Sequence, residues 1–211
     1  MRLFLNPDAG YTTALRTWRQ ISDDVEEHLG CPIEVETPSS EEECIERIKE
    51  AVLAGETGFL AGGGDGTVNL LLNTLMDVAP DPGRITLGAI GLGTSNDFQK
   101  PFSDESMIGG IPLRTDFNGA RPVDVIRVEC RNGSSEPVTR YCLCNASIGI
   151  TAEANALYTS RPLLIRVLKR LSVNAAITAV ALKTLFTWRS QPFLITGDEQ
   201  WSEACRITNL G

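Results

Sequence analysis

The chain has 211 residues, of which 42% are hydrophobic and 22% are charged, and its formal net charge is −8. That length allows one large domain or two small ones with a sizeable core. The acidic balance argues against nucleic acid as a general partner, because a phosphate backbone attracts basic surfaces. No uncharged apolar run is long enough to span a bilayer, and the first residues follow a strand-like pattern rather than that of a signal peptide. We therefore expect a cytoplasmic protein.

The six cysteines are scattered without a C-x-x-C pair, and the single histidine, His28, lies in a polar run. A structural zinc site needs clustered Cys and His, so we expect none. Cysteines dispersed in this way are typical of free thiols in a reducing compartment. Histidine-based catalysis is not expected either, because His28 has the surroundings of a solvated helix residue.

Strand and helix patterns alternate through the first half of the chain. In chain order we predict a strand at 2–6, a helix at 11–29, a strand at 33–37, a helix at 41–54, a strand ending at 61, a helix from 68 and a strand at 84–90. Such alternation predicts a parallel sheet with helices on both faces. Ligands bind beyond the carboxyl ends of such strands. The loops at 6–10, 62–67 and 91–97 are therefore expected at one edge.

The stretch from Thr57 to Met76 predicts a buried strand, a glycine-rich turn and the start of a helix. Four glycines in five positions leave no side chain to keep a ligand away from the backbone, and amides at a helix N-terminus suit a phosphate group. Asp65 would repel a bare phosphate, so we expect it to act through a cation, a water or an acceptor hydroxyl. Together these features indicate phosphoryl chemistry.

After about Gly119 the pattern changes to that of a β-rich region. Its Asn132-Gly133 turn is a strong hairpin signal. The predicted elements are strands at 122–130 and 138–147, a long helical region at 162–188 and a last strand at 204–209. We place a domain boundary near 118–122, which gives an α/β domain at 1–120 and a β-rich domain at 121–211 whose sheet looks incomplete.

The second half carries an unusual charge pattern. From Ala154 to Gly197 there is no Asp or Glu, whereas six Lys and Arg residues occur. Arg166, Lys169 and Arg170 share one face of the predicted helix, opposite a row of leucines. A basic amphipathic helix in an acidic protein is typical of a peripheral membrane contact, here through residues 161–189. It is equally typical of a surface helix that packs its leucines on the core.

Two common phosphate-binding fingerprints are missing. The chain has no G-x-x-x-x-G-K-[ST] sequence and no complete G-x-G-x-x-G sequence. These absences argue against a Walker-type loop and a dinucleotide-binding turn. The indication of function therefore depends on recurrence, because three turns each follow a strand and each combine glycine with Asn, Asp or Thr.

These turns resemble three ordered motifs of the diacylglycerol kinase catalytic domain family, which includes bacterial lipid kinases and the sphingosine and ceramide kinases. The matching stretches are Asn6-Pro-Asp-Ala-Gly10, Gly63-Gly-Asp-Gly-Thr67 and Gly93-Thr-Ser-Asn-Asp-Phe98. Val123-Asp-Val125 and Asn145-Ala-Ser-Ile-Gly149 continue the resemblance. NAD kinases and phosphofructokinases share the central motif, but NAD kinases resemble this chain less at the third.

The resemblance implies a nucleotide-binding α/β domain followed by a β-rich domain, with ATP between them. It also implies Mg²⁺ and the phosphorylation of a lipid hydroxyl, on diacylglycerol or a related lipid, in phospholipid biosynthesis. The positions that match the family's ATP-binding residues are Asn6, Pro7, Asp8, Ala9, Gly10, Thr37, Gly63, Gly64, Asp65, Gly66, Thr67, Val68, Asn69 and Thr94.

Three acidic residues, Asp65, Asp97 and Asp124, match positions that the family links to magnesium and water. Carboxylates that hold a cation suit phosphoryl transfer, which needs positioning and charge neutralisation. Two of them also have structural interpretations. Asp97 has the position of a helix cap, and Asp124 that of a strand-edge residue.

The chain departs from the family pattern at two places. Leu70 follows Asn69 where the family commonly has Glu. Many bacterial members place the catalytic aspartate in a C-terminal Asp-Gly motif, and here the segment Arg206 to Asn209 resembles the strand that leads to it. Either Asp65 is the general base, as in sphingosine kinases, or the base is expected beyond residue 211. We favour the second and expect little turnover from these 211 residues.

Two other functions remain open from the sequence. One is NAD kinase-like phosphorylation of a soluble acceptor, and the other is a non-catalytic nucleotide- or lipid-binding fragment. As partners we expect a lipid substrate at a membrane surface and no nucleic acid, with the protein cytoplasmic or peripheral at the inner membrane surface. Whether the chain forms a homo-oligomer is left open.

Overall fold

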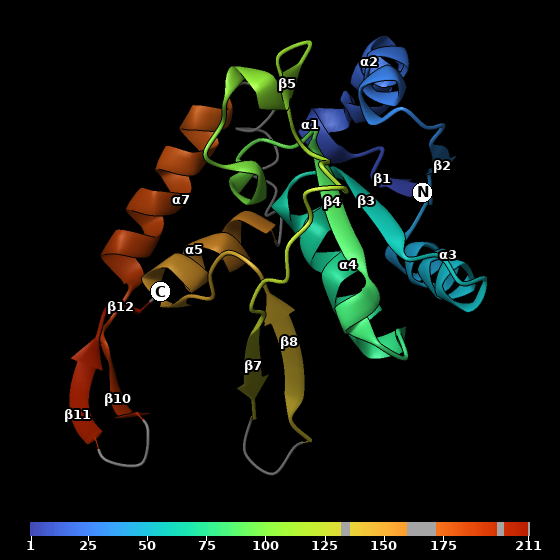
Figure 1. Ribbon diagram of the computed structural model, residues 1–211. Coiled ribbons are helices and arrows are strands. Elements are labelled where there is room, and N and C mark those ends of the chain that lie inside the picture. Colours follow the sequence, from blue (N-terminus) through green and yellow to red (C-terminus); the bar gives the residue numbers. More distant parts are fainter. Residues whose placement is uncertain (132–135, 160–171, 198–200, 211) are drawn as a thin grey trace. The chain divides into compact units, whose positions relative to one another are not determined.

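The computed structural model describes residues 1–131, 136–159, 172–197 and 201–210 (Figure 1). Its contacts divide the chain into two compact units, Met1–Cys144 and Asn145–Gly211, and each is described by itself. The hairpin with which we expected the second domain to begin falls in the first of these units. The domain boundary that we placed near residues 118–122 remains a prediction.

The first unit is built on a six-stranded sheet in the order β2-β1-β3-β4-β6-β5. The four strands β2, β1, β3 and β4 are parallel, whereas β6 pairs antiparallel with β4 and β5 antiparallel with β6. The strands are β1 (Arg2–Leu5), β2 (Glu34–Glu36), β3 (Gly58–Gly63), β4 (Thr86–Gly91), β5 (Met107–Ile108) and β6 (Ile111–Arg114). The predicted parallel sheet is confirmed, with an antiparallel edge that the sequence patterns did not indicate.

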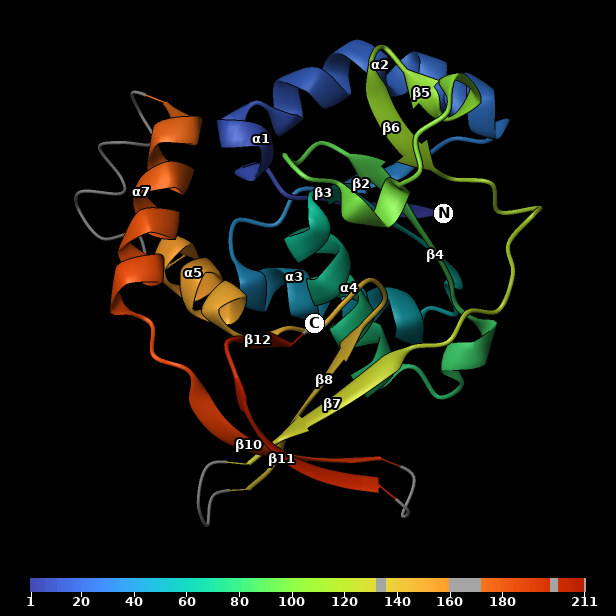
Figure 2. The ribbon, with the colours of Figure 1, turned by 90° about the vertical axis from the view of Figure 1, so that its left-hand side faces the viewer.

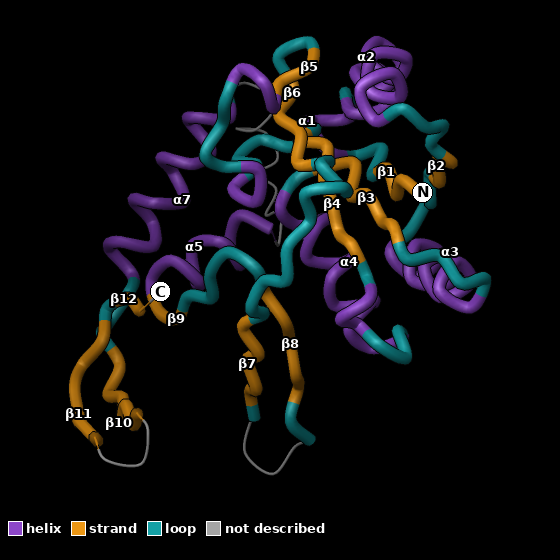
Figure 3. Tube along the Cα trace, in the orientation of Figure 1, coloured by secondary structure: helices purple, strands orange, loops and turns teal. Residues whose placement is uncertain are grey.

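Helices cover both faces of this sheet, as predicted (Figures 2 and 3). They are α1 (Ala9–Thr12), α2 (Ala14–Leu29), α3 (Glu41–Leu53) and α4 (Asp65–Val78). Successive side chains of a strand point to opposite faces. Accordingly Leu3 and Leu5 pack with α2 residues in one core cluster, and Phe4 packs with α3 and α4 residues in another. The sheet is therefore buried on both sides.

The start of the first predicted helix differs from its sequence pattern. Gly10, Tyr11 and Thr12 all have positive φ, between 57° and 67°, so the regular helix begins at Ala14. α3 begins as expected, with the Ser40 hydroxyl accepting a hydrogen bond from the Glu43 N–H at 3.2 Å. This is a normal N-cap.

The predicted hairpin is formed by β7 (Ile126–Cys130) and β8 (Val138–Cys142), and its Asn132-Gly133 turn lies outside the described residues. β8 is attached to α4 by two asparagines. The Asn73 side chain accepts from the Tyr141 N–H and donates to the Tyr141 carbonyl, both at 2.9 Å, and Asn69 donates to the same carbonyl at 2.9 Å. Asn73 thereby satisfies the backbone of β8 as a neighbouring strand would.

The second unit combines two helices with short antiparallel pairings. Its elements are β9 (Ile148–Gly149), α5 (Ile150–Thr159), α7 (Val173–Thr187), β10 (Gln191–Gly197), β11 (Trp201–Ile207) and β12 (Asn209–Leu210). β10 pairs with β11 and β12 with β9, while Ala176 and Val180 of α7 pack against α5. The predicted basic face of Arg166, Lys169 and Arg170 lies outside the described residues. None of the helices that were described has the length and apolarity that crossing a bilayer requires.

Candidate functional site

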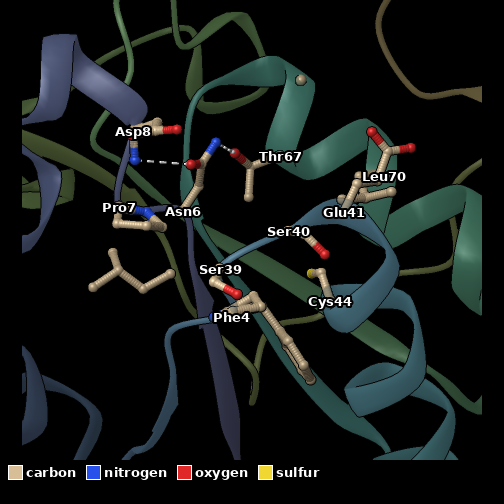
Figure 4. Close-up of a pocket in the computed structure, with 13 residues that line it drawn as sticks. Phe4, Asn6, Pro7, Asp8, Ser39, Ser40, Glu41, Cys44, Thr67 and Leu70 are labelled. Carbon is tan, nitrogen blue, oxygen red and sulfur yellow. Dashed lines mark hydrogen bonds between the residues drawn. The ribbon is translucent and has the colours of Figure 1, made fainter.

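The loop after β1 is connected to α4 through one side chain. The Asn6 N–H donates to the Gly62 carbonyl at 2.9 Å, and Asn6 Nδ2 donates to Thr67 Oγ1 at 3.3 Å. Asn6 Oδ1 accepts from the Asp8 N–H at 3.0 Å, which shapes the turn (Figure 4). The predicted first and second loops therefore meet at the carboxyl end of the sheet.

The loop after β4 packs directly on the other two. A Cβ added to Gly10 would lie 2.6 Å from the Leu92 carbonyl oxygen, and one added to Gly93 would overlap the Gly64 Cα. A Cβ on Gly63 would overlap the Thr67 side chain. Gly66 differs, because a Cβ there has nothing within 4 Å. Glycine is thus required where the loops touch, whereas Gly66 leaves open space above the first turn of α4.

Asn96 organises the third loop from inside. Its side chain is buried, its φ is 50°, and its Nδ2 donates to the Gly91 carbonyl at 3.0 Å and to the Gly93 carbonyl at 3.3 Å. Its Oδ1 accepts from the Gly93 N–H at 3.1 Å. Asn96 was part of the recognised motif but was not among the predicted site residues. Asn96 could have been selected from the sequence because Asn tolerates the left-handed backbone conformation and here stands beside glycines.

Asp65 has a structural contact in addition to any chemical role. Its Oδ1 accepts from the Phe98 N–H at 3.1 Å, and the residue is partly buried in the first turn of α4. On the other side, Arg114 Nη1 donates to the Phe98 carbonyl at 2.7 Å, and its guanidinium lies 4.8 Å from the centroid of the Phe98 ring. Two opposite charges therefore hold Phe98 in place. Arg114 could not be selected from the sequence, because its partner Phe98 is 16 residues away.

The other predicted acidic residues lie in different surroundings. Asp97 is exposed and pairs with Lys100 at 2.6 Å, and the N-cap position of the short helix Asp97–Gln99 is taken by Asn96 rather than by Asp97. Asp124 is exposed and precedes β7. No group of three or more His, Cys, Asp or Glu side chains in the part of the chain that the structure describes is placed to hold a metal ion. Asp65, Asp97 and Asp124 therefore do not form a ready-made ion site by themselves.

The remaining predicted ATP-binding residues surround the same edge. Thr37 and Thr94 are exposed, in the loops after β2 and β4, and Thr67 is buried beneath the Asn6 side chain. The Val68 side chain is only 4% exposed and belongs to the core, and its N–H donates to the Gly64 carbonyl at 3.2 Å. Asn69 is exposed and holds β8.

A pocket of about 250 Å³ opens beside these loops (Figure 4). We call it the first pocket, and it is lined by Phe4, Leu5, Asn6, Pro7, Asp8, Pro38, Ser39, Ser40, Glu41, Cys44, Gly66, Thr67 and Leu70. A second pocket, of about 300 Å³, shares Glu41, Gly66 and Leu70 with it and continues along α4 to Asp77 and Arg140. The two pockets together extend from the glycine loops past the side of α4.

Cys44 contributes a neutral wall to the first pocket. Burial raises the pKa of its thiol to about 11, and the negative charges of Glu41 and Glu43 add to the effect. The thiol is therefore protonated at neutral pH and is a poor nucleophile. The cysteines whose side chains are described form no disulfide, in agreement with the expected free thiols.

Comparison with known proteins identifies the family. The model of the diacylglycerol kinase catalytic domain matches residues 1–128. Bacillus subtilis diacylglycerol kinase is 32% identical over 135 residues, which cover 60% of this chain and 41% of that protein. A probable YegS-like lipid kinase of Yersinia enterocolitica is 44% identical over 66 residues, covering 31% of this chain and 19% of the relative. A probable YegS-like lipid kinase of Serratia proteamaculans is 38% identical over 82 residues, which cover 38% of this chain and 26% of the relative. The chain thus spans less than half the length of these relatives. The sequence resemblance is confirmed, and the chain belongs to the diacylglycerol kinase catalytic domain family.

Proposed function

We propose that this protein is an ATP-dependent lipid kinase that transfers the γ-phosphoryl group of ATP to a hydroxyl of diacylglycerol or a related lipid. Family membership supports a lipid kinase in general. The observation that supports ATP as the donor is that the three glycine loops meet beside the N-terminus of α4, where Gly66 leaves open space for a phosphate group.

The phosphates are proposed to lie over the first turn of α4. The first backbone amides of a helix carry partial positive charge, which favours an anion. In α4 the Thr67 N–H already donates to the Gly64 carbonyl at 2.9 Å, so the amides of Asp65 and Gly66 are the ones proposed to face the phosphates. Gly66 keeps the space above this turn open. The hydrogen bond from Asn6 to Thr67 holds the loop after β1 beside that space. Thr37 and Thr94 add exposed hydroxyls around the same edge of the sheet.

Mg²⁺ fits this site as a partner of the nucleotide rather than of the protein alone. Mg²⁺ commonly binds through one or two carboxylates plus substrate phosphates and water. We propose that Asp65 supplies a carboxylate, since Phe98 occupies only one of its oxygens in the structure, and that Asp97 and Asp124 act through water. When bound, the ion would neutralise charge on the phosphates.

The reaction is an in-line substitution at the γ-phosphorus. The lipid hydroxyl oxygen forms a bond to that phosphorus, the bond to the β–γ bridging oxygen breaks, and ADP leaves while the hydroxyl proton passes to a general base. The role of the loops is to hold the phosphates in line with the acceptor. Asp65 orients the third loop through the Phe98 N–H and so positions the residues around it.

A transfer assay tests this proposal. The 211-residue chain, and a version extended to the length of its relatives, would be incubated with γ-labelled ATP, Mg²⁺ and micelles that contain diacylglycerol or other lipid alcohols. We expect labelled phospholipid from the extended version and little from the shorter chain. NAD without detergent serves as the comparison acceptor. Label in NAD but in no lipid would contradict a lipid acceptor.

We also propose a peripheral membrane contact through residues 161–189. In the second unit, α7 exposes 62% of Leu185 and 83% of Phe186 beside the cation Lys183. Apolar side chains next to basic ones suit the surface of an anionic bilayer. Replacing Arg166, Lys169 and Arg170 by Glu, or Phe186 by Ser, should reduce sedimentation with anionic liposomes several-fold. Sedimentation that equals the wild type's with both variants would leave α7 as an ordinary surface helix.

A further inference from the structure

The wall of the first pocket that faces away from the glycine loops carries a carboxylate. Glu41 stands in the first turn of α3 and lines both the first and the second pocket. Figure 4 shows its carboxylate beside Leu70 of α4, across the pocket from Asn6 and Asp8. Leu70 offers no hydrogen-bonding group at this point, so Glu41 determines the polarity of this end of the pocket.

The neighbouring polar side chains are already engaged with one another. The Ser39 N–H and hydroxyl donate to the Glu43 carboxylate at 2.9 and 2.7 Å, and the Ser40 hydroxyl caps α3. Asn6 is held by Thr67 and Asp8. Within the described residues, the Glu41 carboxylate makes no hydrogen bond or ion pair, so its acceptor oxygens remain available to a ligand.

The charge of Glu41 selects which part of a nucleotide lies next to it. A carboxylate repels phosphate but accepts hydrogen bonds from a pair of hydroxyls, as acidic residues do with ribose in dinucleotide-binding sites. The amides at the α4 N-terminus attract the phosphates, and Asn6, which is bonded to Thr67 in that first turn, lies across the pocket from Glu41 (Figure 4). The nucleoside must then extend toward α3 and Leu70.

We propose that Glu41 binds the ribose hydroxyls of the nucleotide and makes this site selective for ribonucleotides. This inference rests on the proposed function, because it takes ATP as the ligand of the first pocket. Among the described lining residues of the first pocket the other carboxylate is Asp8, in the loop beside Asn6, and it is the alternative that the test must distinguish from Glu41. Glu41 is therefore assigned as a specificity-determining residue.

Calorimetric titrations of the chain with ATP, 2′-deoxy-ATP and 3′-deoxy-ATP, all with Mg²⁺, test this assignment. Loss of a hydrogen bond to a charged acceptor weakens binding by about tenfold or more. We expect wild-type protein to bind ATP about tenfold more tightly than either deoxy form. Glu41→Ala should bind all three alike, with the affinity that the wild type has for the deoxy forms. Glu41→Gln, which keeps one acceptor oxygen, should fall between them.

Glu42→Ala is the matched control, because Glu42 shares the first turn of α3 but lines neither pocket. It should keep the full preference for ATP, and thermal unfolding should be alike for both alanine variants. A preference that survives in Glu41→Ala, or that disappears in Asp8→Asn instead, overturns the assignment while ATP binding itself stands. A wild-type chain that binds no ATP overturns the proposed function and this inference together.

Discussion

Gly93→Ala is expected to weaken ATP binding by about tenfold or more, because the two loops that are proposed to hold the phosphates can no longer pack together. The added Cβ would overlap the Gly64 Cα and lie 2.8 Å from the Gly64 nitrogen. Both contacts are with backbone, which has no rotamer by which to move aside. The second and third loops must separate, and overpacking of this kind also costs about 1–3 kcal/mol of stability.

Gly66→Ala is the matched control, since it adds the same methyl group to the neighbouring loop. Nothing lies within 4 Å of a Cβ at Gly66, and its φ is not in the left-handed region. Alanine in a helix is favoured over glycine by about 0.5–1 kcal/mol, so the variant should be as stable as the wild type or slightly more so. Its methyl group nevertheless occupies the proposed phosphate position and should weaken ATP binding at least about tenfold.

Thermal unfolding and calorimetric ATP titration of the two glycine variants separate packing from binding. The expected pattern is that both lose affinity and only Gly93→Ala loses stability. Unchanged ATP affinity in Gly66→Ala would show that the phosphates lie elsewhere. A stable Gly93→Ala protein that binds ATP normally would contradict the tight loop contact as a requirement of the site.

Two substitutions of Asp65 should distinguish its structural role from its chemical role. Asp65→Asn retains an oxygen that accepts from the Phe98 N–H, whereas Asp65→Ala removes it. We expect a loss of about 1–2 kcal/mol in the unfolding free energy of Asp65→Ala and less than about 1 kcal/mol for Asp65→Asn. Both variants should reduce phosphoryl transfer by the extended protein on the order of 100-fold, because neither has the carboxylate charge.

Denaturant unfolding and the Mg²⁺ dependence of transfer are the measurements for Asp65. Asp97→Asn is a comparison for the unfolding measurement alone, because Asp97 is exposed and its pair with Lys100 contributes little to stability. If Asp65→Asn transfers phosphate at the wild-type rate, the carboxylate has only the role of holding the third loop, and the proposed link to a cation is wrong.

The sequence was informative where local pattern and tertiary structure agree. The apolar runs at Leu3–Leu5 and Phe59–Ala61 became parallel strands because helices cover both of their faces. The order of strands and helices then placed the three loops at one edge, which is a consequence of topology. Gly64 was predicted to give a ligand access to the backbone, and the structure adds that Gly64 and Gly93 also let the backbones of two loops touch.

Other features depend on contacts between distant residues and left no periodic signal. Arg114 acts on Phe98 only because β6 pairs with β4, and β5 and β6 together are too short to show an alternating pattern. Asn73 was read as a helix residue, although its side chain serves the backbone of Tyr141. The strand β10 was missed because it directly follows a helix.

The most direct test of the central claim is a calorimetric titration of the wild-type 211-residue chain with ATP in the presence of Mg²⁺. The proposed phosphate site predicts binding of ATP at one site, with saturation between about 1 μM and 1 mM, the usual range of enzyme KM values. The same titration of Gly93→Ala should show weak binding or none. Absence of any binding by the wild-type chain at millimolar ATP would contradict the nucleotide site on which the whole interpretation depends.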